Sequence, residues 1–142
     1  MTDEHKSILI NVADKQAEHL GNLIVKSSRY FLEGRHADCY YIELEIRENF
    51  ITYEIKDADN KALDDLEKKI SNALNDYLKK KDKERRANEK NKNSTILINN
   101  HESNLAKTEW IKAIRTYRRA LRKHLKALGY FPDKKDRTRM NF

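Results

Sequence analysis

This sequence of 142 residues has little of what several common protein classes require. Its single cysteine, Cys39, excludes an internal disulfide framework, and its three glycines leave no glycine-rich loop that could cradle a phosphate. No apolar run approaches the length of about 18 residues that a membrane-spanning helix needs, so we expect no membrane partner. The acidic start, MTDEHKSILINV, is not typical of a secretory signal, which favours a cytoplasmic protein.

Positive charge is unevenly distributed along the chain. The net charge is +7, but residues 1–78 hold 10 Lys/Arg against 16 Asp/Glu, whereas residues 79–142 hold 20 against 7. An acidic front and a strongly cationic back are typical of proteins that bind a polyanion, most often nucleic acid. The composition therefore indicates a class of partner.

The front part of the chain predicts a helix followed by a β-hairpin. Apolar residues recur at helical spacing from Ile8 to Glu33, and Gly34 is a natural helix stop. The period then changes to two, with apolar residues at 42, 44 and 46 and again at 51, 53 and 55, each set alternating with polar or charged residues. These two strands, with a possible third at residues 95–98, predict an α+β fold that is mainly helical.

Two further helices are expected in the back part of the chain. One begins near Asp57 or Asp59, either of which can cap it, and carries an apolar stripe that includes Leu63 and Ile70. The charged run from 79 to 93 is either a solvated extension of this helix or a flexible linker. The last helix covers residues 104–128, and Gly129 with Pro132 beyond it form its stop signal.

The expected organisation has four parts. Residues 1–78 form an acidic helix-hairpin-helix core, and residues 79–103 form the charged linker or helix extension with the short strand 95–98. Residues 104–131 form a basic amphipathic helix, and residues 132–142 form a basic tail. Because the core is thin and an isolated hairpin is marginally stable, we expect the chain to form a homodimer.

The last helix carries the candidate site. Its apolar seam, which includes Ile114, Leu121 and Leu125, faces away from a run of positive side chains. Like-charge repulsion along such a run has no folding benefit and would be relieved by phosphates. An aromatic residue beside the seam could stack on an unpaired base. The expected nucleic-acid-binding residues are Lys112, Arg115, Tyr117, Arg118, Arg119, Arg122, Lys123 and Lys126.

Motifs for catalysis or for a metal are weak. Glu54-x-Lys56 after the hairpin, with Asp38 upstream, resembles part of the acid-x-lysine arrangement of metal-dependent nucleases of the PD-(D/E)xK type, but the same triplet recurs elsewhere in this charged chain. His36-x-x-Cys39 has metal-site spacing without a second pair of ligands. We therefore expect no enzyme activity and no cofactor.

These observations favour a small accessory or regulatory protein that binds nucleic acid, with duplex DNA preferred, through its last helix, while the front part mediates assembly. The alternative is a protein-binding inhibitor or adaptor, of phage or plasmid origin, that acts on a nucleic-acid enzyme. A metal-dependent nuclease is the second alternative. A further interpretation of the positive run is that acidic residues of the same chain, or of a second copy, neutralise it.

Overall fold

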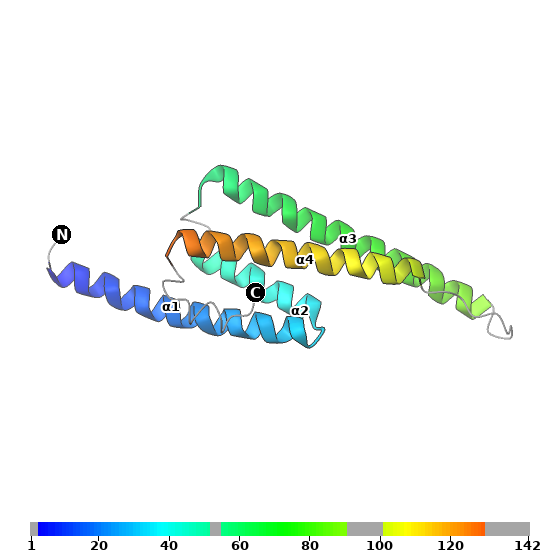
Figure 1. Cartoon of the computed structure of the whole chain (residues 1–142), viewed down its shortest axis with the longest axis horizontal. Helices are drawn as coiled ribbons and strands as arrows, with labels where there is room; N and C mark the ends of the chain where they lie inside the picture. The colour runs from blue at the N-terminus through cyan, green and yellow to red at the C-terminus, as the bar shows by residue number, and fades with distance from the viewer. Residues whose placement is uncertain (1–2, 52–54, 91–100, 130–142) are drawn as a thin grey trace. The chain divides into compact units, whose positions relative to one another are not determined.

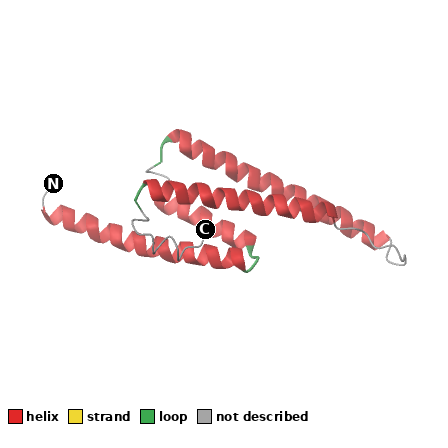
Figure 2. Ribbon diagram, in the orientation of Figure 1, coloured by secondary structure: helices red, strands yellow, loops and turns green. Residues whose placement is uncertain are grey.

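The computed structural model describes residues 3–51, 55–90 and 101–129, and it describes side chains from Gln16 onward within these ranges. Every regular element in this part of the chain is helical (Figures 1 and 2). The elements are α1 (Asp3–Leu32), α2 (His36–Ile46), the π-helical turn η1 (Arg47–Ile51), α3 (Asp57–Lys90) and α4 (His101–Ala127). They form two compact units, one from Met1–Asn60 with Arg118–Phe142 and one from Lys61–Tyr117. Helix α4 thus contributes to both.

The first unit is built on a helical hairpin. Helix α1 ends where predicted, because Gly34 has a positive φ of 78° that a side chain would disfavour. The N–H of Arg35 donates to the carbonyl of Tyr30 at 2.8 Å and the N–H of Gly34 to that of Phe31 at 3.2 Å, which are the two bonds of a Schellman cap. After this turn α2 runs back along α1 (Figure 1).

The core of the first unit draws on α1, α2, η1 and the end of α4. Its apolar side chains are less than one-tenth exposed, so their removal from water supplies the main driving force for this unit. They are Leu20, Leu23, Ile24, Cys39, Ile42, Ile46, Phe50, Ile51, Leu121 and Leu125.

The second unit pairs α3 with the first part of α4. Leu63 and Ile70 of α3 are buried, as are Trp110 and Ile114 of α4. Between the two helices, the Tyr77 ring stacks on Trp110 with a centroid separation of 6.0 Å and an interplanar angle of 23°. At the start of α4, Glu84 accepts a hydrogen bond from the Ser103 backbone N–H at 3.1 Å, which satisfies one of the donors that a helix N-terminus leaves unpaired.

The predicted α+β class with three helices is wrong, because residues 42–51 are helical and the described chain has four α-helices and no strand. The buried residues of α2 and η1 explain the error, because they follow the helical pattern i, i+3, i+4, i+7 and i+11 and share one face: Cys39, Ile42, Glu43, Ile46 and Phe50. Since Glu43 lies on that face, the apolar residues alone do not show a continuous helical period. The alternation of the apolar residues 42, 44 and 46 therefore dominated the sequence pattern.

The three predicted helices are present in the structure. Helices at 8–33, from 57 and at 104–128 correspond to α1, α3 and α4, each observed a few residues longer at one end or more. Asp57 and Asp59 lie in the first turn of α3, and residues 79–90 continue that helix without a break. Residues 52–54 of the expected second strand, the expected strand 95–98 and the tail 132–142 lie outside the described residues.

Candidate nucleic-acid interface

Helix α4 positions all eight candidate binding residues, and the structure divides them into two groups. Five are exposed, namely Lys112, Arg115, Arg119, Lys123 and Lys126, and three are buried, namely Tyr117, Arg118 and Arg122. The helix ends at Gly129, whose φ is 82°, with the Gly129 N–H donating to the carbonyl of Lys126. The single positive run in the sequence is therefore two different structural features.

The buried arginines share one carboxylate in the first unit. Arg122 makes a two-pronged contact with Glu43, with Nη1–Oε2 at 2.7 Å and Nη2–Oε1 at 2.5 Å. Arg118 Nε lies 3.2 Å from the same Oε1, and its Nη2 donates to Ser28 Oγ at 3.1 Å. Ser27 Oγ also donates to Glu43 Oε1. The carboxylate is completely buried, and such charges are tolerated in a core only when they are paired and hydrogen-bonded. We call these five residues the Glu43 cluster.

The Glu43 cluster corrects two predicted site residues. Arg118 is 4% exposed and Arg122 is 3% exposed, so neither guanidinium can reach a phosphate from this conformation. Arg118 also lies over the Phe31 ring, at 4.6 Å from its centroid. Within the first unit, Arg118 holds α4 against α1 and α2, and Arg122 holds α4 against α2.

Tyr117 is the third correction. Its side chain is fully buried, and its hydroxyl donates to Glu67 Oε1 at 2.8 Å. A ring in this position is not available to stack on a base. The residue belongs to the helix–helix packing of the second unit.

Three exposed cations of α4 lie together in the first unit: Arg119, Lys123 and Lys126. They are spaced four and three residues apart, so they share one side of the helix over about 10 Å at 1.5 Å per residue. None of the three forms an ion pair within the described part of the chain. We call these three residues the cationic face.

The second-unit part of α4 exposes two more cations. Lys112 lies 3.7 Å from Glu109, and Arg115 is one helical turn before Arg119 in the sequence. From Trp110 to Ala127 the helix contains no Asp or Glu. The three residues of the cationic face therefore have no carboxylate within their own part of the helix.

The cations near the end of α3 are in a different situation. Asp82 pairs with Arg85 at 2.8 Å and with Arg86 at 3.0 Å, and Glu89 also pairs with Arg85 at 3.0 Å. The hydrogen bond from Arg85 lowers the pKa of Asp82 below its ordinary value. These are helix-local pairs at three- and four-residue spacing, so the two arginines of this run are paired within their own helix.

The weaker candidate motifs are dispersed. Cys39 is buried with its sulfur 3.3 Å from Ser27 Oγ, and burial raises the pKa of this thiol. The His36 ring packs edge-on against Phe31, and Asp38 pairs with Arg35 at 2.9 Å. Lys56 is exposed, and Glu54 lies outside the described residues. Among the described side chains, no three His, Cys, Asp or Glu residues are grouped so that they could hold a metal ion.

The residue that the sequence analysis missed is Glu43. Its spacing from the apolar residues could have identified it. Glu43 lies four residues after Cys39 and seven before Phe50, so it falls on the helical face that the apolar residues of this segment share. A glutamate at a core position indicates a buried partner, and the arginine-rich final helix was available to supply it.

Comparisons with other proteins return no relative. The chain matches no protein-family model, no curated protein and no solved structure. A separate property of the described helices is that none combines the length and the apolar character needed to cross a bilayer.

Proposed function

We propose that this protein binds nucleic acid, with duplex DNA as the preferred form, through the cationic face of α4, and that it acts as an accessory or regulatory protein. The observation that supports this most strongly is the cationic face itself. Arg119, Lys123 and Lys126 are exposed, regularly spaced and without carboxylate partners in the described chain. Such a row repels itself, and a row of phosphates removes the repulsion.

The expected mode of binding is contact with the phosphate backbone. Arginine can bind a phosphate through two parallel hydrogen bonds, and lysine acts as a point charge. These contacts release condensed counterions and carry little sequence information. Three phosphate contacts by the cationic face correspond to a log–log salt slope of roughly −3 on duplex DNA.

A salt titration with three ligands tests the proposal. The affinity of the full chain is measured by fluorescence anisotropy for a labelled DNA duplex, the matching single strand and an RNA hairpin. The test variant carries Arg119→Glu, Lys123→Glu and Lys126→Glu. The control carries Lys61→Glu, Lys68→Glu and Lys69→Glu, which make the same change in net charge at exposed positions of α3. Circular dichroism checks that both stay helical.

The proposal expects the test variant to lose most of the salt slope and at least about tenfold in duplex affinity at low salt, while the control stays close to wild type. Equal losses in both variants would show that net charge alone matters and would refute the cationic face. If the wild-type chain bound no oligonucleotide in dilute buffer, nucleic-acid binding itself would be refuted. The alternative of an acidic protein partner would then be pursued by pull-down.

Self-association remains a prediction. It is tested by sedimentation velocity at two protein concentrations, with and without duplex DNA. A monomer at both concentrations would leave the binding proposal intact and remove the homodimer from it.

A further inference from the structure

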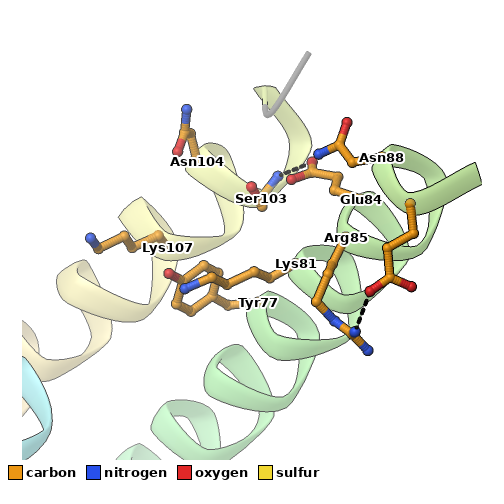
Figure 3. A pocket seen from close by; sticks show the side chains of 9 residues that line it. Tyr77, Lys81, Glu84, Arg85, Asn88, Ser103, Asn104 and Lys107 are labelled. Carbon is orange, nitrogen blue, oxygen red and sulfur yellow. Dashed lines mark hydrogen bonds and ion pairs between the residues drawn. The ribbon is translucent and has the colours of Figure 1, made fainter. Parts of the chain in front are cut away.

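A second, separate feature of the molecule lies entirely within the second unit. A pocket of about 610 Å³ opens between the C-terminal part of α3 and the start of α4 (Figure 3). Its lining includes Tyr77, Lys81, Glu84, Arg85, Ser103 and Lys107. Pockets that bind small molecules commonly measure about 300–1,000 Å³, so this one has room for a nucleotide-sized group.

One wall of the pocket is an aromatic ring held in place from behind. Tyr77 is half-buried, and its ring stacks on Trp110, which is 8% exposed. The ammonium of Lys81 lies over the Tyr77 ring at 5.7 Å from its centroid, and the Lys81 side chain crosses that ring in Figure 3. A ring fixed in this way is a suitable stacking surface, since little further ordering is needed when a base packs on it.

The charges around the ring favour an anion. The lining holds the cations Lys81, Arg85 and Lys107 against the carboxylates Glu84 and Glu89, so its net charge is positive. Glu89 pairs with Arg85 at 3.0 Å, and Glu84 accepts the Ser103 N–H at 3.1 Å. By contrast, Lys81 and Lys107 pair with no carboxylate in the part of the chain that the structure describes. An aromatic surface next to two unneutralised ammonium groups suits a base with its phosphate.

We propose that this pocket takes one unpaired nucleotide of a single-stranded segment, with its base stacked on Tyr77 and its phosphate paired by Lys81 and Lys107. This inference rests on the proposed function, because it names a second contact made with the same class of polymer. The amides of Asn88 and Asn104, which also line the pocket, carry donors and acceptors for the edge of the base. Stacking tolerates every base, so we expect little base preference.

The chain carries its own reporter for this site. Trp110 is its single tryptophan and contacts the ring on which the base would stack, so its fluorescence should change when single-stranded DNA binds. The full chain is titrated with a single-stranded oligonucleotide and with the matching duplex, and affinities are measured in parallel by anisotropy.

Three variants and one control separate stacking, charge and folding. Tyr77→Leu removes the stacking surface and Tyr77→Phe keeps it. Lys81→Ala with Lys107→Ala removes the two ammonium groups at exposed positions, so it tests the pocket even if Tyr77→Leu fails to fold. The control, Lys61→Ala with Lys69→Ala, removes two exposed lysines of α3 outside the pocket.

The expected result is a loss of about tenfold in single-strand affinity for Tyr77→Leu and for the Lys81/Lys107 variant, with the Trp110 response abolished in Tyr77→Leu and duplex affinity unchanged. Tyr77→Phe and the control should behave as wild type. Unchanged single-strand affinity in the Lys81/Lys107 variant would overturn the pocket proposal, while duplex binding that depends on Arg119 would keep the proposed function. Absence of binding to every oligonucleotide would overturn both.

Discussion

Neighbouring residues of one helix segment have opposite roles in this protein. Arg118 and Arg122 are buried in the Glu43 cluster, whereas Arg119 and Lys123, each the next residue in the chain, are exposed and form no ion pair with any residue that the structure describes. A step of one residue turns about 100° around a helix, which is enough to move a side chain from core to solvent. The comparison shows that a run of positive residues is not a single functional unit.

The last part of α3 shows a third outcome for the same residue types. Its arginines are exposed like Arg119 but are paired with Asp82 and Glu89 of the same helix. The three cases differ in the position of the carboxylate that pairs with the cation. The buried arginines pair with a carboxylate of another helix, and the arginines of α3 pair with carboxylates of their own helix. The cationic face pairs with no carboxylate in the described chain. Among these three cases, the cationic face leaves positive charge for a partner, as Lys81 and Lys107 do at the pocket of the second unit.

Breaking the Glu43 cluster should have the largest effect. Glu43→Gln removes the carboxylate that neutralises two buried guanidinium groups, so we expect the free energy of unfolding to fall by about 3–5 kcal/mol. Urea denaturation followed by circular dichroism measures it. Glu45→Gln, on the same helix but with a partly exposed side chain, should change the stability by less than about 0.5 kcal/mol.

A triple variant sharpens the interpretation of that loss. Glu43→Met with Arg118→Leu and Arg122→Leu replaces the buried charges by apolar side chains, and it should recover most of the stability because no unpaired charge remains. If Glu43→Gln were as stable as wild type, the carboxylate would not be needed in the core, and the division between buried and exposed cations would lose its basis.

The second prediction compares two adjacent residues directly. Arg122→Met should cost about 2–4 kcal/mol of stability, because Glu43 keeps only part of its pairing. Lys123→Met should change stability by less than about 0.5 kcal/mol but should reduce the salt slope of duplex binding by about 1. The measurements are thermal unfolding and anisotropy at several salt concentrations. Similar stability losses in the two variants would contradict the assignment of Arg122 to the core and Lys123 to the surface.

The smallest expected effect concerns pH and the thiol of Cys39. Burial raises its pKa in the folded state, so the folded chain holds the thiol proton at pH values where the unfolded chain has released it. The free energy of unfolding should therefore decrease as the pH rises above the ordinary thiol value of about 8.5. Cys39→Ala should remove this decrease, as measured by urea denaturation between pH 7 and pH 10. An identical pH profile in the variant would show that other groups cause the decrease.

Much of the helical architecture could be predicted from local patterns. The apolar stripes of α1, α3 and α4 repeat at helical spacing, and Gly34 and Gly129 end their helices with positive φ as expected. These features depend on residues within one or two helical turns of each other, so they can be recognised in the amino-acid sequence. Helix α2 was not predictable in this way, since a buried charge at Glu43 interrupted its pattern.

The candidate site was predicted only in part, because some of its residues depend on local sequence and others on partners far away in the chain. The residue type and spacing of Lys112, Arg115, Arg119, Lys123 and Lys126 were sufficient to place them on an exposed side of a helix. Nothing local distinguishes Arg118 and Arg122 from them, because the partner of both is 75 residues or more away in the chain. The pocket at Tyr77 likewise depends on two helices that the sequence separates.

The sequence by itself determined the presence of three long helices, the carboxyl-terminal ends of the first and the last of them, and the excess of positive charge on the last one, because helix periodicity, glycine conformation and charge are local properties. Only the tertiary structure decided which of those charges are available to a partner. A buried carboxylate must be paired to remain charged in a core, and Glu43 therefore holds Arg118 and Arg122 inside while their neighbours remain in solvent.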